Sequence, residues 1–109
     1  LVDGAHAIGQ ISLDVPSLGA DFYVSNGHKW LYSPKSSAIL WAKKEVQALL
    51  HPTVISGLGK GETPFQLDFS YQGTSDVTAL IAMWDALSWR QLRGEEEIMG
   101  YIRWLAGEG

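Results

Sequence analysis

The sequence predicts an α/β fold, and three observations support this prediction. Short β-prone runs alternate with helical segments, the longest helical pattern carries one apolar stripe, and the strands are too few to close a complete sheet. The 109 residues are enough for one modest domain. Because 46% of them are hydrophobic and 18% are charged, the composition is that of a globular chain and not of a disordered one.

Three strands are expected in the first part of the chain. Leu1–Val2 is interpreted as the end of a buried strand that runs into the turn Asp3–Gly4. Residues 20–25 are a second β-prone run, which ends at the turn-forming dipeptide Asn26–Gly27. Residues 37–42 form a continuous apolar run, typical of a strand that is covered on both faces of a sheet.

Two short helical segments and one loop are expected between the strands and the longer helices. Residues 14–18 predict a helical turn that Asp14 caps, and residues 43–50 predict a short helix. Residues 53–56 are compatible with a further strand. Residues 57–63 are rich in glycine but lack the spacing and the Gly-Lys-Ser/Thr ending of a phosphate-binding P-loop, so we expect a mobile loop there.

The strongest helical pattern runs from Asp76 to Arg93, with Thr74 or Ser75 as its N-cap. Its apolar residues recur every three or four positions and form one stripe, made up of Val77, Leu80, Ile81, Trp84 and Leu87. Gly94 is expected to end this helix. The acidic residues 95–97 then open a second helix, whose inward face is predicted to contain Ile98, Ile102 and Leu105.

The composition also excludes several classes of function. The net charge of −4 gives no general attraction to nucleic acid or to an anionic membrane, and no apolar run is long enough to cross a bilayer. The chain has no Cys, which excludes a disulfide framework and a Cys-based zinc site. We therefore expect a cytoplasmic protein without nucleic-acid or membrane partners, and we interpret its five Trp as core and interface residues. Since Leu1 is not Met, we expect a fragment of a longer protein.

Residues that can do chemistry follow the first two predicted strands. Lys29 lies just past a strand end, where α/β proteins bind ligands, and a partly desolvated amine attacks carbonyl groups. Asp3 can hold a cationic ring nitrogen, and His6 can bond a phenolic oxygen. Together with an imine-forming lysine, these are the requirements of pyridoxal phosphate chemistry.

Each of these residues also has a commoner structural interpretation. An arbitrary lysine is usually a surface residue, an aspartate in this position is usually a turn residue, and His6 can simply be satisfied near the start of a helix. A further alternative is a metal site formed by Asp3, His6 and His28, but it leaves Lys29 unexplained. We therefore predict no metal.

Several motifs, in order, resemble the central segment of class V aminotransferase-fold enzymes. The resemblance is closest to the isopenicillin N epimerase-like branch, near cysteine desulfurases and hercynylcysteine sulfoxide lyases. It rests on Val2–Ala7, Gly19–Tyr23, Asn26–Trp30, Pro34, Ser36–Trp41 and Tyr71–Asp76, and it is least clear after Arg93. It implies that residues 1–109 are a partial class V pyridoxal-phosphate-binding domain. Such a fragment is the central part of the large domain of a fold-type I, aspartate aminotransferase-like enzyme.

The resemblance implies a role for each matching residue near the cofactor. Lys29 is expected to form the internal aldimine with pyridoxal 5'-phosphate and later to move the α-proton of the substrate. Asp3 is expected to pair with the pyridine nitrogen, and His6 to bond the phenolic oxygen. Asn26 and His28 match positions that reach the cofactor phosphate.

A second group of matching residues implies a homodimer. Gly73 and Thr74 correspond to a segment that, in family dimers, reaches the phosphate of the neighbouring subunit's cofactor. A helix N-terminus there would suit an anion. Ser75 replaces the Arg that is usual in the family, so the charge role of that Arg is not carried over.

The resemblance implies an amino acid, or a sulfur-containing amino acid, as substrate, and leaves three reaction types open. These are carbon–sulfur cleavage by a lyase or desulfurase, epimerisation and transamination. Desulfurases carry their persulfide-forming Cys further toward the C-terminus, so its absence here does not exclude that reaction. The alternative is a non-catalytic truncated or dimer-forming fragment, and the 109 residues alone are expected to be inactive.

Overall fold

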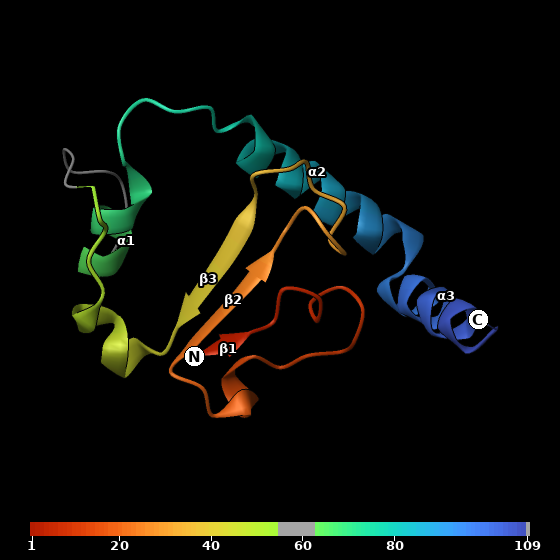
Figure 1. Cartoon of the computed structure of the whole chain (residues 1–109). Helices are drawn as coiled ribbons and strands as arrows, with labels where there is room; N and C mark the ends of the chain where they lie inside the picture. Colours follow the sequence, from red (N-terminus) through yellow and green to blue (C-terminus); the bar gives the residue numbers. More distant parts are fainter. Residues whose placement is uncertain (55–62, 109) are drawn as a thin grey trace. The chain divides into compact units, whose positions relative to one another are not determined.

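The computed structural model describes residues 1–54 and 63–108 and has the mixed α/β architecture that the sequence predicts (Figure 1). The sequence shows no linker that would divide the chain, yet the contacts separate into two compact units. Residues 1–41 and 77–109 form the first, called the sheet unit here, and residues 42–76 form the second. All the residues expected to hold the cofactor in one subunit belong to the sheet unit.

The sheet contains β1 (Val2–Asp3), β2 (Phe22–Asn26) and β3 (Ala38–Ala42), in that order. β1 and β2 are parallel, with Asp3 opposite Val24, and the Gly4 N–H donates to the Val24 carbonyl at 2.8 Å. The Gly27 N–H donates to the Ser37 carbonyl at 3.0 Å, which joins the end of β2 to the start of β3. β2 and β3 therefore run in opposite directions (Figure 1).

The alternation of side chains along β2 separates its buried face from the face that it shares with Asp3. Tyr23 and Ser25 are 1% and 3% exposed, and their hydroxyls both donate to the Gly4 carbonyl, at 3.3 and 2.8 Å. Val24 and Asn26 project to the opposite side, together with Asp3, because paired residues of parallel strands share a face. A Cβ on Gly4 would lie 2.1 Å from Tyr23 Oη, so this position requires glycine.

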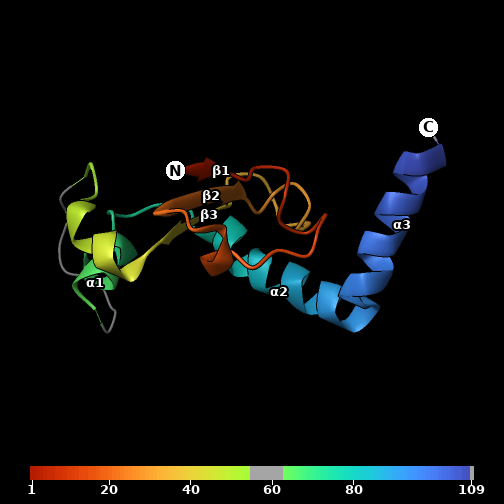
Figure 2. The same ribbon diagram turned by 90° about the horizontal axis from the view of Figure 1, so that it is seen from below.

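Two longer helices complete the sheet unit, α2 (Thr78–Arg93) and α3 (Glu95–Glu108). α2 lies along one side of the sheet, and the chain changes direction between α2 and α3 (Figure 2). Gly94 separates the two helices with φ +99°, as predicted. The predicted start of α2 is wrong, because the N-cap is Val77 and not Thr74 or Ser75. Within the first turn, the Ala79 carbonyl accepts a hydrogen bond from Ser33 Oγ at 3.1 Å.

The predicted apolar faces are only partly covered. Ile98 is 8% exposed, as expected for an inward residue, but Leu105 is 53% exposed. On α2 the stripe is open, with Ile81 66% and Trp84 74% exposed. Leu1 is also exposed, contrary to the prediction of a buried strand end. Helical periodicity identifies an apolar face but not what covers it, and no described residue buries these side chains.

The shorter elements show where local signals were sufficient and where they were not. Pro16–Leu18 forms a 3₁₀ helix, but its N-cap is Val15, so the predicted Asp14 cap is wrong; the Asp14 carbonyl instead accepts from Ser17 Oγ at 2.8 Å. Lys44–Leu49 is a 3₁₀ helix within the span expected to be helical.

α1 (Pro64–Ser70) was not predicted, although Thr63 and Gln66 form a capping box ahead of it and Pro64 stands in its first turn. Of the strand expected at 53–56, residues 53–54 form a bend and 55–56 lie outside the described residues. Residues 57–62 of the expected glycine-rich loop also lie outside the described residues. Within the described parts of the chain, no helix has the length and apolar character needed to span a membrane.

Candidate active site

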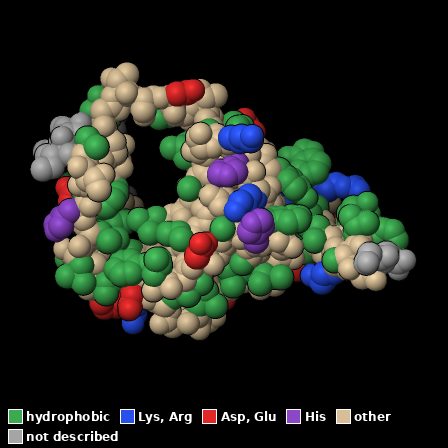
Figure 3. Space-filling model, viewed as in Figure 1, with side chains coloured by type: hydrophobic (Ala, Val, Ile, Leu, Met, Phe, Trp, Pro, Cys, Tyr) green, Lys and Arg blue, Asp and Glu red, His purple; other side chains and the backbone are tan. Residues whose placement is uncertain are grey.

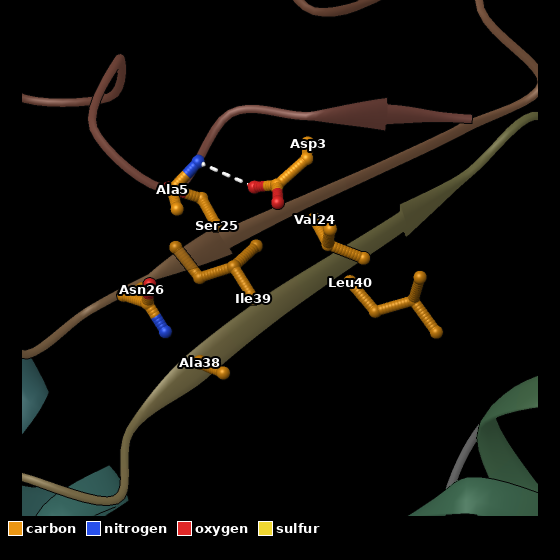
Figure 4. A pocket seen from close by; sticks show the side chains of 8 residues that line it. All are labelled: Asp3, Ala5, Val24, Ser25, Asn26, Ala38, Ile39 and Leu40. Atoms are coloured by element: carbon orange, nitrogen blue, oxygen red, sulfur yellow. Dashed lines mark hydrogen bonds between the residues drawn. The ribbon is translucent and has the colours of Figure 1, made fainter.

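The carboxyl ends of β1 and β2 open onto a cavity of about 430 Å³ (Figure 4). Its walls come from all three strands and the turn after β1, and the lining residues are Asp3, Ala5, Val24, Ser25, Asn26, Ala38, Ile39 and Leu40. The edge of a sheet beyond the carboxyl ends of its parallel strands is where α/β proteins bind ligands, and this volume is in the range of small-molecule sites. Asp3 and Asn26 supply the carboxylate and the amide of its lining.

The Asp3 carboxylate is fixed through one of its two oxygens. Oδ1 accepts a hydrogen bond from the Ala5 N–H at 3.0 Å, so the side chain closes a local turn directly after β1. No hydrogen bond from the described residues reaches Oδ2. One oxygen is thus held by the backbone, and the other is available to a donor in the cavity.

His6 contacts both Lys29 and Trp30, which lie more than twenty residues after it in the sequence. Trp30 Nε1 donates to His6 Nδ1 at 3.1 Å, and Lys29 Nζ lies 3.2 Å from His6 Nε2. An indole N–H can only donate, so a neutral His6 carries its proton on Nε2, a tautomer assigned from this bond. Nε2 then faces Lys29 Nζ at hydrogen-bond distance, which places the amine of Lys29 against the imidazole of His6.

His28 points toward the start of β3. Its Nδ1 lies 3.0 Å from the Ser37 carbonyl oxygen and therefore donates to it, because a carbonyl oxygen can only accept. Nε2 is left as the ring nitrogen for a ligand, and it donates to an anion only when the ring carries both protons. The described residues contain no group of three or more His, Asp and Glu side chains placed to hold a metal ion.

The space-filling view agrees with this grouping. His, basic and acidic side chains gather on one face, beyond the ends of β1 and β2 (Figure 3). The structure thus brings His6 and Lys29 into contact and places Asp3 and Asn26 at one cavity. The structure directs Nδ1 of His28 toward the backbone carbonyl of Ser37.

Gly73 and Thr74 belong to the 42–76 unit and are described by their local conformation alone. Gly73 has φ +103°, and Thr74 is exposed. Because α2 begins at Thr78, neither residue lies at the helix N-terminus that the sequence predicted there. Their role at the phosphate of a neighbouring subunit's cofactor stays a prediction.

For two residues beside this site, the structure shows a role that the sequence did not indicate. Trp30 was grouped with the core and interface tryptophans, but its indole nitrogen bonds His6. Its position directly after Lys29 was the available signal. Arg90 lies in the last turn of α2, where the helix dipole favours a cation, but it is 0% exposed and bonds the Trp30 carbonyl. No pattern in the sequence indicates this burial.

A lysine, a histidine and a carboxylate beyond two parallel strands of an α/β sheet are the features of a pyridoxal phosphate enzyme. The chain belongs to the aminotransferase class V family, whose family model matches residues 1–107. Pyridoxal phosphate is the cofactor of this family, as the resemblance implied.

Relatives of several kinds are similar to this chain. An L-cysteine desulfhydrase-like protein from Epichloe uncinata is 31% identical over 131 residues, covering 100% of this chain and 29% of that protein. The hercynylcysteine sulfoxide lyase of Schizosaccharomyces pombe is 31% identical over 118 residues, covering 100% of this chain and 30% of the lyase. The crystal structure of the cysteine desulfurase CsdA from Escherichia coli matches with a TM-score of 0.63 and 28% identity, covering 84% of this chain and 24% of CsdA.

These matches confirm the predicted family and its fold. The similarity to cysteine desulfurases and to a hercynylcysteine sulfoxide lyase is also confirmed, whereas the isopenicillin N epimerase-like branch stays a prediction. The chain spans less than a third of the length of these two curated relatives, at 29% and 30%.

Proposed function

We propose that this chain is the cofactor-anchoring central part of a pyridoxal-phosphate-dependent enzyme that cleaves the carbon–sulfur bond of a cysteine-type amino acid. The observation that carries the proposal is the 3.2 Å contact between Lys29 Nζ and His6 Nε2. His6 directly follows Ala5, which lines the cavity together with Asp3 and Asn26. The names of the relatives, desulfhydrase-like protein, sulfoxide lyase and desulfurase, favour sulfur chemistry among the reactions open to the family.

The side chains present fit this cofactor chemically. A ring nitrogen that carries a proton needs an anionic acceptor, and Asp3 Oδ2 has no other partner among the described residues. A phenolic oxygen needs a donor, and the His6 Nε2–H faces the amine to which the cofactor's carbonyl carbon attaches. The cavity of about 430 Å³ is large enough for a small aromatic ligand.

When bound, pyridoxal phosphate supplies a protonated ring that withdraws electrons as the Cα–H bond of the substrate breaks. Lys29 anchors the cofactor through Nζ and, after its amine is released, takes the proton from Cα. Asp3 keeps the ring nitrogen protonated by accepting its N–H at Oδ2. His6 holds the phenolic oxygen through Nε2, while the Trp30 N–H fixes the imidazole from the other side.

The phosphate is assigned to donors at the end of β2 and to a second copy of the chain. Asn26 donates from its side-chain amide, and His28 donates from Nε2 in its doubly protonated form. Gly73 and Thr74 of the partner subunit approach the same phosphate in a homodimer. The 109 residues contain no Cys, so a desulfurase reaction would take its persulfide-forming thiol from another part of the complete protein.

The first test is covalent capture of the cofactor by the complete protein. Added pyridoxal phosphate is expected to give a visible absorbance band that borohydride abolishes, leaving the reduced cofactor on the peptide that contains Lys29. Lys29→Ala is expected to lose both signals. Lys35→Ala, at an exposed lysine of the same segment, is the matched control and is expected to keep them. A band that survives Lys29→Ala, or no band in the unmodified protein, would refute the proposal.

The second test identifies the reaction. The complete protein is offered cysteine, a cysteine sulfoxide conjugate and an epimerisable amino acid, and the products are identified. We expect carbon–sulfur cleavage, with sulfide, pyruvate and ammonia formed from cysteine. Inverted amino acid or a keto acid without sulfur release would favour epimerisation or transamination. Captured cofactor without turnover would favour the non-catalytic alternative. Chelation is expected to leave activity unchanged, whereas the metal alternative predicts its loss.

A further inference from the structure

Arg90 is a fully buried cation at the end of α2, and its hydrogen bonds lead to the site. Its side chain is 0% exposed, while Arg93, three residues further on, is 58% exposed. Arg90 Nη1 donates to the Trp30 carbonyl at 2.5 Å, and Nη2 donates to the Gly9 carbonyl at 3.1 Å. A buried charge needs this kind of compensation, since desolvation of an unpaired guanidinium is costly.

The two carbonyls belong to the two segments that carry the proposed site. Gly9 lies in the loop after β1 that contains His6, and Trp30 directly follows Lys29. The two backbones are already in close approach, because a Cβ on Gly9 would lie 2.6 Å from the Trp30 carbonyl oxygen, and Gly9 has φ +86°. One guanidinium therefore holds together the segments whose side chains meet at the contact between Lys29 and His6.

The rest of the guanidinium is fixed by its other neighbours. Nε donates to Glu95 Oε1 at 2.8 Å and Nη2 donates to Glu95 Oε2, so the carboxylate binds the fork in a bidentate manner. The guanidinium carbon also lies 5.1 Å from the centre of the Tyr32 ring. Only arginine has a planar fork that can reach two carbonyls and a carboxylate at once, whereas lysine is a single point charge.

We propose that Arg90 is a positioning residue. It fixes the His6 loop against the Lys29 segment, so that His6 Nε2 and Lys29 Nζ are aligned before the cofactor binds. This inference rests on the proposed function, in which the two side chains act on the same cofactor. Arg90 touches neither cofactor nor substrate and acts only through the backbone at Gly9 and Trp30.

The test compares Arg90→Lys with the matched control Arg93→Ala in the complete protein. Arg93 lies on the same helix, but its ion pair with Glu97 is exposed on both sides, and it bonds neither the Gly9 nor the Trp30 carbonyl. Hydrogen exchange followed by mass spectrometry reports on residues 4–11 and 28–33. Borohydride trapping gives the fraction of protein with cofactor on Lys29, and kcat and KM are measured per loaded site.

For Arg90→Lys we expect faster exchange in both segments, a lower fraction of trapped Lys29, and a kcat lower by about 10- to 100-fold at nearly constant KM. Arg93→Ala should match the unmodified protein. A purely structural role would reduce the amount of folded protein but leave kcat per loaded site unchanged. A folded Arg90→Lys with unchanged kcat and unchanged exchange overturns the proposal.

Glu95→Gln keeps the test decisive if Arg90→Lys does not fold. It leaves Arg90 and both carbonyl acceptors in place but removes the charge that orients the guanidinium. Faster exchange in residues 4–11 and 28–33 with a lower kcat supports the proposal, and values equal to those of Arg93→Ala overturn it. If the unmodified protein never captures the cofactor on Lys29, the proposed function fails. The exchange measurement then still decides whether Arg90 holds the two segments.

Discussion

Replacing Trp30 with phenylalanine isolates one hydrogen bond of the candidate site. The change removes the indole N–H that donates to His6 Nδ1 at 3.1 Å and keeps an aromatic ring in its place. Without this donor, His6 is free to turn and to exchange its tautomers, because it is exposed and its other ring contact is the one with Lys29. Part of the binding free energy of the cofactor must then be used to order the imidazole. We therefore expect weaker cofactor binding with an intact fold.

The size of the effect follows from that bond. A neutral hydrogen bond contributes about 0.5 to 1.5 kcal/mol net, and this one lies between partly exposed groups, so the lower part of the range applies. Loss of about 0.5 to 1 kcal/mol corresponds to a rise in the Kd for pyridoxal phosphate of about 2- to 5-fold. A larger effect is not expected, since orienting one ring cannot contribute more than the bond that orients it.

The assay is a titration of the complete apoprotein with pyridoxal phosphate, read from the absorbance of the species attached to Lys29. Trp104→Phe is the matched control, because Trp104 is 58% exposed on α3 and contacts Tyr101 instead of the site. Urea denaturation should show similar stabilities for the two variants. Equal Kd values for Trp30→Phe and Trp104→Phe would refute the role of this bond.

Two further substitutions test the site and its support. Gly4→Ala is expected to lower the free energy of unfolding by about 2 to 5 kcal/mol, because the new Cβ would meet the buried Tyr23 ring and disturb two bonds to the Gly4 carbonyl. Gly100→Ala is the control and should stabilise by about 0.5 to 1 kcal/mol, because it lies inside α3 with its nearest new contact at 4.0 Å. Equal effects of both in urea denaturation would contradict this reasoning. Asp3→Asn should keep the turn to Ala5 and raise the Kd for pyridoxal phosphate about 10- to 100-fold, since it removes a charged acceptor; an unchanged Kd would exclude Asp3 from the ring nitrogen.

Local signals were enough to predict the elements that carry the site. The β-prone run before Asn26, the apolar run that became β3 and the glycine that ends α2 each depend on neighbouring residues, and all appear in the structure. We expected both His6 and Lys29 near one cofactor, but their direct contact was not predicted, because it depends on the pairing of β1 with β2. A fuller use of the Thr63–Gln66 capping signal would also have predicted α1.

Features that depend on distant partners could not be predicted in this way. Arg90 looks like an ordinary helix-end cation, and its burial depends on carbonyls 81 and 60 residues away in sequence. The bond from Ser33 Oγ to the Ala79 carbonyl joins residues 46 positions apart in sequence, and no local pattern indicates it. The exposed apolar stripe on α2 is a second example. Helical periodicity identifies an apolar face, but it does not indicate whether another part of the described chain packs against that face.

The bonds of Arg90 to Gly9 and Trp30 go to backbone oxygens alone, and this separates two constraints on the sequence. The identity of the side chain at position 30 does not affect these bonds, so a homologue can change the donor to His6 without loosening the link between the segments. At position 9 the requirement is reversed, because what matters is that no side chain is present. Substitutions at position 30 can therefore change the hydrogen bonding of His6, while the bonds of Arg90 keep the backbone spacing between the His6 loop and the Lys29 segment.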